Sequence, residues 1–204
     1  MTESEIARAF AECGALLNGH FLLTSGLHSD RYFEKFQVLQ YPHLTDRLGA
    51  ELAARLKRRL GFAPASATIR TVVGPATGGI LLSHVVARHL GTGTRSLFTE
   101  REEGKMVFRR GFRLEPGEPV VVVEDVVTTG GSVNEVLSAV RSAGGQVAAI
   151  GLLVDRSGGR ATAAWEDIPV EALLRLDIAA WPPGECPLCR QGLPLTERGS
   201  RHLR

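Results

Sequence analysis

Two adjacent acids followed by a run of small polar residues form the most informative segment of the chain. Glu124 and Asp125 are followed, after Val126 and Val127, by the run Thr128-Thr129-Gly130-Gly131-Ser132. Hydroxyls, flexible glycines and the unpaired backbone N–H groups of a loop that opens a helix suit a phosphate dianion. A carboxylate pair beside this loop would repel a polyphosphate, but it can accept hydrogen bonds from vicinal sugar hydroxyls. The combination indicates a site for a ribose 5-phosphate.

Two common nucleotide-binding loops do not fit this segment. It lacks the Gly-Lys-Ser/Thr of a Walker-type loop, and its acids precede the glycines instead of following them by about twenty residues as in a dinucleotide fold. The structural alternative is a strand and a helix joined by a glycine-rich turn, with two solvated acids.

The elements on either side would place the acids at the edge of a sheet. Val120–Val123 is a run of β-branched residues with no polar face, which predicts a central parallel strand buried on both sides. The acids then emerge at the carboxyl edge, where open α/β sheets bind ligands. The amphipathic run Val133–Ala143 predicts the helix that follows the loop.

The segment from Glu124 to Ser132 closely resembles the phosphoribosyl pyrophosphate (PRPP) motif of the type I phosphoribosyltransferases, in the form found in orotate phosphoribosyltransferases. The resemblance implies an α/β fold with a central, mostly parallel sheet flanked by helices, under a small hood. It implies that the two acids hold the ribose hydroxyls and that the loop holds the 5-phosphate. The PRPP-binding residues expected here are Glu124, Asp125, Val126, Val127, Thr128, Thr129, Gly130, Gly131 and Ser132.

A second glycine-rich turn follows the predicted strand at Thr71–Val73. Gly78 and Gly79 open a helix predicted over Ile80–Leu90, and in the family the corresponding turn wraps the pyrophosphate with backbone amides. Many orotate enzymes carry a lysine where Gly78 stands. Its absence removes one positive charge from the pyrophosphate site.

A charged segment follows the short strand predicted at Arg95–Phe98. Thr99–Gly111 reads either as a solvated hairpin or, by its position in the resembled family, as the mobile loop that enters the neighbouring subunit's site. Lys105 is the first choice for catalysis and Arg101 the second, with Asp125 fixing the ribose. The family's histidine is missing, and the sequence leaves open which basic residues replace it.

Recognition of the base is expected in the aromatic-rich, irregular stretch His20–Gln40 and after the strand predicted at Val147–Val154. A Ser-Gly turn with a following aromatic suits a flat, anionic pyrimidine, and an arginine can bind a carboxylate through two parallel hydrogen bonds. A hairpin that packs its aromatics into the core is the alternative for the first segment. The orotate-binding residues expected from the resemblance are Ser25, Gly26, Phe33, Thr128 and Arg156.

Composition indicates one soluble globular domain over residues 1–204. The hood is expected at about 18–42 plus the C-terminal segment, and the core at about 43–160. With 24 basic and 22 acidic residues, the net charge of +2 gives no case for nucleic-acid or membrane binding. There is no apolar run of about 20 residues and no basic start of a signal peptide, so a cytoplasmic location is expected. Only three of the basic residues are lysines, a bias that a GC-rich genome or adaptation to heat would each produce.

Helices are predicted over Glu3–Leu17, ending at Asn18-Gly19, and from Pro42 to about Leu60, and a last strand over Pro169–Leu176. Arg190–Arg204 is expected to be a mobile tail.

Three cysteines do not make a disulfide framework. Cys13 falls on the apolar face of the first helix, as a small core residue would. Cys186 and Cys189 form a Cys-x-x-Cys pair, which supplies half of a tetrahedral zinc site that two copies across a dimer axis would complete. Buried or free thiols, a metal site and a redox pair all stay open.

The function implied by the resemblance is transfer of the 5-phosphoribosyl group from PRPP to orotate, giving orotidine 5'-monophosphate and pyrophosphate in pyrimidine biosynthesis. It implies Mg²⁺ held mainly by substrate oxygens, with no direct protein ligands, and a homodimer with shared active sites. The alternatives are a type I phosphoribosyltransferase for a purine base and a regulator that senses PRPP without turnover. The sequence has no helix-turn-helix segment or basic face that would favour a regulator.

Overall fold

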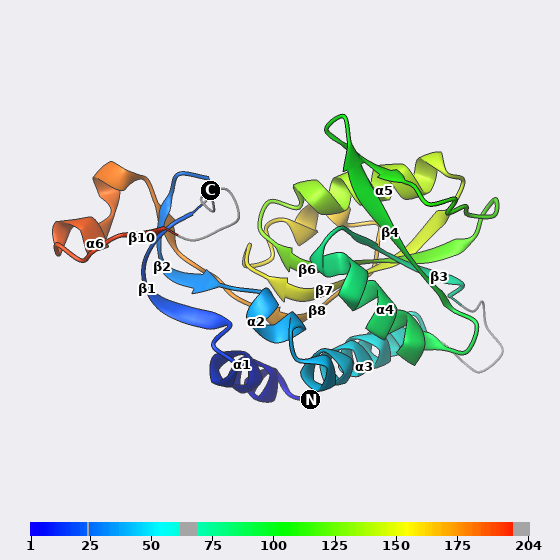
Figure 1. The fold of residues 1–204 in the computed structure, drawn as a ribbon, viewed down its shortest axis with the longest axis horizontal. Coiled ribbons are helices and arrows are strands. Elements are labelled where there is room, and N and C mark those ends of the chain that lie inside the picture. The colour runs from blue at the N-terminus through cyan, green and yellow to red at the C-terminus, as the bar shows by residue number, and fades with distance from the viewer. Residues whose placement is uncertain (24, 62–68, 198–204) are drawn as a thin grey trace.

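A computed structural model of the chain describes residues 1–23, 25–61 and 69–197, which form two β-sheets and their covering helices (Figure 1). The helices are α1 Glu3–Glu12, α2 Phe36–Leu39, α3 Pro42–Arg59, α4 Gly78–Leu90, α5 Gly131–Ser142 and α6 Pro187–Arg190, with 3-10 turns η1 Thr162–Trp165 and η2 Pro183–Glu185. The strands are β1 Leu16–Leu22, β2 His28–Phe33, β3 Thr71–Pro75, β4 Arg95–Glu102, β5 Lys105–Phe108, β6 Pro119–Val127, β7 Gln146–Asp155, β8 Val170–Arg175, β9 Ala180–Trp181 and β10 Thr196–Glu197.

The larger sheet has six strands in the order β5-β4-β3-β6-β7-β8. All neighbours are parallel except the hairpin pair β4 and β5. Helices α3 and α4 cover one face and α5 covers the other (Figure 1). The predicted α/β fold with a central, mostly parallel sheet is confirmed.

Strand β6 lies in the middle of this sheet and is buried on both faces, as predicted. Val121 and Val123 pack into the core with Leu52 of α3, whereas Val120 and Val122 face the second core beneath α5. All four valines have no exposed surface. Because both faces are covered with apolar side chains, β6 gives rigid support to the two acids, Glu124 and Asp125, near its carboxyl end.

The smaller sheet, which we call the hood, has four strands in the order β10-β1-β2-β9. The β1–β2 hairpin is flanked on both sides by two-residue strands from the C-terminal segment (Figure 1). The stretch expected to be irregular over residues 20–40 is therefore mostly this hairpin plus α2. The expected mobile tail is wrong for residues 190–197, which include β10, and its remainder lies outside the described residues.

Two predicted boundaries differ from the structure. The first helix ends at Glu12 rather than Leu17, because Gly14 adopts a φ of 71° and the backbone N–H of Ala15 donates to the carbonyl of Phe10. This glycine ends the helix in the left-handed conformation that glycine favours. The central sheet continues to β8, so the core extends well beyond the expected limit near residue 160.

The other elements agree with prediction within a few residues, namely α3, β3, α4, β6, α5, β7 and β8. Across residues 1–23, 25–61 and 69–197, no helix combines the length and apolar character needed to cross a membrane.

Candidate active site at the carboxyl edge of the central sheet

Glu124 and Asp125 are buried within the second half of β6, which continues past the predicted strand end to Val127. Glu124 is 6% exposed and Asp125 is 1% exposed, so the alternative of two solvated acids is wrong. The Glu124 carboxylate accepts a hydrogen bond of 3.0 Å from the backbone N–H of Asp125. Burial, and then the negative charge of Asp125, raise the pKa of Glu124 well above its usual value. The pair therefore favours a ligand that brings positive charge or hydrogen-bond donors.

Lys35 is the partner of these acids, and sequence reasoning missed it. Its ammonium lies 2.9 Å from Oδ2 of Asp125 and donates to Oδ1 at 3.1 Å. Burial opposes the charge of Lys35, but the Asp125 and Glu124 carboxylates outweigh it and raise the pKa of Lys35. Lys35 follows β2 in the hood, so this ion pair joins the hood to the central sheet.

Gly78 lies against the same carboxylate, which explains the departure noted from the sequence. A Cβ atom placed on Gly78 would lie 1.6 Å from Oδ2 of Asp125. No side chain fits there without moving Asp125, so the lysine expected at this position from the resemblance has no room in this arrangement. The ammonium of Lys35, which comes from the segment after β2, contacts the same oxygen of Asp125.

The predicted phosphate loop connects β6 to the N-terminus of α5. Gly130 has a φ of 82°, and a Cβ atom there would lie 2.9 Å from the ring of Trp165. The Trp165 indole donates to the side chain of Asn134 at 2.6 Å, which fixes the ring behind the loop. A pocket of about 40 Å³ is lined by Glu124, Val126, Val127, Thr128, Thr129, Gly130, Gly131, Ser132 and Val133. Its position at a helix N-terminus suits an anion.

Arg156 lies beside the loop, at the end of the neighbouring strand β7. Its backbone N–H donates to the carbonyl of Val127 at 2.8 Å. The preceding Asp155 is fully buried and accepts hydrogen bonds from the backbone N–H and the hydroxyl of Ser157 and from the N–H of Gly159, which order the turn. Nε of Arg156 is buried and, within the described part of the chain, donates to no acceptor. Burial lowers the pKa of Arg156, opposed by Tyr32.

Comparison with known proteins places this geometry in a family. The family model "Phosphoribosyl transferase domain" matches residues 43–184. The orotate phosphoribosyltransferase of Desulforamulus reducens is 52% identical over 203 residues and is covered over 100% of both chains, and that of Pelotomaculum thermopropionicum is 51% identical with the same coverage. The chain belongs to the orotate phosphoribosyltransferase family.

Solved structures agree with this assignment. The crystal structure of orotate phosphoribosyltransferase from Aeropyrum pernix is 26% identical, covers 84% of this chain and 93% of its own, and superposes with a TM-score of 0.64. The family predicted from residues 124–132 is thus confirmed by relatives that span the whole chain.

In this orotate phosphoribosyltransferase family member, the predicted base-binding turn lies at the tip of the β1–β2 hairpin. Gly26 has a φ of 80°, and its N–H donates to the carbonyl of Leu23. The ring of Phe33 is only 4% exposed and packs edge to face against Phe10 at 5.2 Å, so it belongs to the core. Tyr32, the neighbouring residue on β2, interacts with Arg156 and partly offsets the lowering of the Arg156 pKa by burial.

Arg101 and Lys105 lie on a hairpin formed by β4 and β5, the first of the two alternatives stated for residues 99–111. Positive φ angles at Glu103 and Gly104, 49° and 82°, make the tight turn. Arg101 pairs with Glu135 of α5 at 2.8 Å and donates to the carbonyl of Gly104. Lys105 lines a surface pocket of about 600 Å³ beside α5. The hairpin therefore places both residues along α5, not on the buried acids.

Glu124, Asp125, the loop and Arg156 lie at one sheet edge, as the sequence predicted. Lys35 was not predicted to join them. The pair of Lys35 and Asp125 is separated by 90 residues. Lysine is rare in this arginine-rich chain, which has three, and this rarity was the feature of the sequence that could have drawn attention to Lys35.

Proposed function

We propose that the chain transfers the 5-phosphoribosyl group of PRPP to orotate, producing orotidine 5'-monophosphate and pyrophosphate, as a step of pyrimidine biosynthesis. The observation that carries the choice of base is the buried Nε of Arg156, which has no hydrogen-bond acceptor among the described residues and lies next to the proposed ribose-phosphate site. A guanidinium in this state suits the carboxylate of orotate, which purine bases lack. The names of the full-length relatives support the same choice.

The ribose phosphate would bind at the end of β6. Glu124 and Asp125 accept hydrogen bonds from the ribose hydroxyls, and the amides and hydroxyls of Thr128–Ser132 hold the 5-phosphate at the start of α5. Val126 and Val127 line the same pocket. Fixing the ribose on both sides holds the anomeric carbon in one position for attack.

The base would lie between the hood and the end of β7. The turn that contains Ser25 and Gly26 would face the pyrimidine, Thr128 would border it, and Arg156 would bind its carboxylate. The position of Phe33 in the core favours Tyr32 as the aromatic contact, with Phe33 supporting the strand from beneath.

The pyrophosphate leaves as the bond to the anomeric carbon breaks through an oxocarbenium-like state, so its growing negative charge needs positive partners. The Gly78 and Gly79 amides at the N-terminus of α4 and the ammonium of Lys35 would meet it from one side. Mg²⁺, when bound to the substrate, supplies further positive charge, and an acidic pair that favours cationic ligands fits its presence.

Lys105 and Arg101 would complete the pyrophosphate site from a second subunit. Both lie along α5 of their own chain, away from the acid pair, on a hairpin that projects from the sheet (Figure 1). This placement supports a homodimer in which each hairpin serves the neighbouring site. Within such a dimer, Lys105 neutralises the departing pyrophosphate and Arg101 assists after leaving Glu135.

A turnover assay tests this proposal. The purified protein is incubated with PRPP and Mg²⁺, and the ultraviolet absorbance of orotate is followed, with adenine, guanine and hypoxanthine in parallel. Loss of orotate without consumption of purines is the expected result. Turnover of a purine instead would make it a purine phosphoribosyltransferase, and PRPP binding without turnover of any base would make it a regulator.

A further inference from the structure

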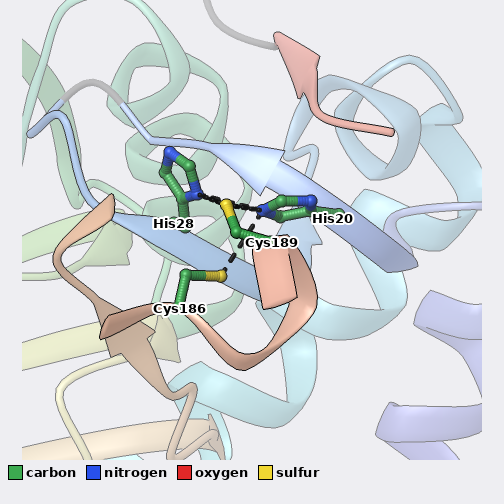
Figure 2. Close-up of side chains that lie close together, drawn as sticks. All are labelled: His20, His28, Cys186 and Cys189. Atoms are coloured by element: carbon green, nitrogen blue, oxygen red, sulfur yellow. Dashed lines mark hydrogen bonds between the residues drawn. The ribbon is translucent and has the colours of Figure 1, made fainter. Parts of the chain in front are cut away.

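Four side chains with metal-binding atoms converge in the hood, away from the acid pair of the central sheet. His20 comes from β1, His28 from β2, and Cys186 and Cys189 from the C-terminal segment around α6 (Figure 2). Their four ligand atoms all lie within 4.8 Å of one another. The two histidines are 4% and 5% exposed, and Cys186 is 1% exposed.

The spacing of these atoms matches a tetrahedron around one small ion. Zinc bonds of about 2.3 Å to sulfur and about 2.0 Å to nitrogen require ligand atoms roughly 3.3 to 3.8 Å apart. Nε2 of His20 lies 3.0 Å from Nδ1 of His28, 3.5 Å from the sulfur of Cys186 and 3.7 Å from that of Cys189. The sulfur of Cys189 lies 3.2 Å from Nδ1 of His28. Small adjustments would place an ion at the centre.

The protein also fixes the orientation of one histidine. Nδ1 of His20 lies 2.9 Å from the carbonyl oxygen of Leu193, which can only accept a hydrogen bond. Nδ1 therefore carries the proton, and Nε2 presents its lone pair to the two sulfurs. A backbone carbonyl that holds the second nitrogen is the usual support of a metal-binding histidine.

The C-terminal segment lacks another anchor of comparable strength. Between residues 179 and 197, Cys186 is the only buried residue of this described stretch. Strands β9 and β10, which flank the hairpin, have two residues each. A segment this short of apolar contacts needs a link of another kind to stay on the sheet, and a metal ion supplies one.

We propose that His20, His28, Cys186 and Cys189 form a structural zinc site within a single chain. Two thiolates and two imidazoles in a tetrahedral arrangement favour zinc among the common metals. Binding releases the two thiol protons and leaves no position open for substrate, so the ion stabilises rather than reacts. The second Cys-x-x-Cys pair that a site across a dimer axis needs is replaced here by two histidines.

The site also has a consequence for the base pocket, which rests on the proposed function. His20 and His28 stand on the two strands that lead into and out of the turn containing Ser25 and Gly26. An ion that joins both strands to the C-terminal segment would hold this turn in place. Removal of the ion should therefore weaken orotate binding more than PRPP binding.

Metal content tests the proposal directly. Untagged protein purified without chelators should contain one zinc per chain by inductively coupled plasma mass spectrometry. Cys186→Ser and His20→Ala should each lower this to near zero, whereas the matched variant Cys13→Ser should keep it, because Cys13 follows α1 and packs against the apolar core instead of the cluster. One zinc per two chains would overturn the proposal in favour of a site between subunits.

Wild-type protein provides a test that does not depend on how the variants fold. Metal-free protein titrated with Co²⁺ should develop the thiolate charge-transfer and visible bands of a tetrahedral site at one equivalent, and zinc should abolish them. Chelation should lower the melting temperature by more than about 5 °C. No bands after Co²⁺ addition to fully reduced protein, or a Cys186–Cys189 disulfide in the protein as purified, would overturn the proposal. Neither readout requires orotate turnover, so failure here is separate from failure of the proposed reaction.

Discussion

The central sheet and the hood are held together in different ways. The central sheet has an apolar cluster on each face, and its strand β6 is buried except at Pro119 and Val126, which are half-buried. The hood consists of the β1–β2 hairpin and the two-residue strands β9 and β10. Its buried residues include His20, His28 and Cys186. One unit is stabilised by apolar burial and the other by a small number of polar links.

This difference decides where each unit can carry chemistry. The apolar support under β6 allows two acids to be buried side by side, an arrangement that destabilises the empty fold but prepares it for ligand. The hood has little apolar burial of this kind. Loss of one of its polar links should therefore affect folding before it affects catalysis. Substitutions at the sheet edge, in contrast, should affect catalysis first.

The largest expected effect comes from the projecting hairpin, which should matter to chemistry and not to stability. Lys105→Ala should lower kcat by about 10²- to 10³-fold, because one positive partner of the leaving pyrophosphate is lost. PRPP binding by calorimetry should stay unchanged. An unaltered kcat would remove Lys105 from this role.

A mixing experiment adds the test of shared sites. Equal amounts of Lys105→Ala and Asp125→Asn protein should regain about a quarter of wild-type activity after subunit exchange, because each mixed dimer has one intact site. Exchange should be verified with labelled subunits. Failure to regain activity in verified mixed dimers would place the hairpin over its own site.

Arg156→Ala should have the next largest effect, at the edge where the hood meets the sheet. The KM for orotate should rise roughly 10- to 100-fold, since a charge-assisted hydrogen-bond pair is lost, while the KM for PRPP stays within about twofold. Arg156→Lys should recover only part, because a lysine cannot form the two parallel bonds. Arg160→Ala, which removes an exposed arginine of the same turn, is the control. Equal changes in both KM values would contradict the assignment.

Lys35→Met should weaken PRPP binding by roughly tenfold and also lower the melting temperature, since it leaves Asp125 buried without its ion-pair partner. It tests whether hood and sheet are joined by this pair. Lys57→Met, in which a lysine that donates to the carbonyl of His89 is lost, is the matched control. A stable variant with normal PRPP affinity would show that the link is dispensable.

The smallest effect in this series is expected from Glu124→Gln, which should raise the melting temperature, whereas Lys35→Met should lower it. Since burial and Asp125 raise the pKa of Glu124 in the folded chain above the usual 4.5, this group favours the fold at low pH, and that contribution is lost as the pH rises through the folded-state pKa. The variant should melt roughly 2 to 4 °C higher than wild type at pH 8, and the difference should shrink toward pH 4.5. Glu166→Gln, at an exposed site, should show no such trend.

Local patterns predicted the sheet edge well because its determinants are local. Four valines, two acids and a small-residue loop lie within fifteen positions, and each belongs to the same strand–turn–helix unit. The helix limit at Glu12 was missed because Leu16 and Leu17 continue the helical spacing, although Gly14 had already ended the helix.

The contacts that link distant segments could not be predicted in this way. Lys35 meets Asp125, and His20 meets Cys186 across 166 residues, only after both sheets are formed. Cys-x-x-Cys was recognised as half of a metal site, but nothing in the spacing of His20 and His28 identified the other half. The two histidines lie on neighbouring strands, and only the pairing of β1 with β2 brings their rings together.

The order of the hood strands has a consequence for synthesis on the ribosome. Every strand of the central sheet has been made by Arg175, whereas β9 and β10, which close the hood on both sides, are among the last described residues to emerge. At a translation rate of about 5 to 20 residues per second, the nascent chain can assemble its core while the β1–β2 hairpin still waits for its flanks. A chain cut short before Cys186 would keep every strand of the central sheet and lack β10, so the hood closes only after the sheet that carries the acid pair has been made.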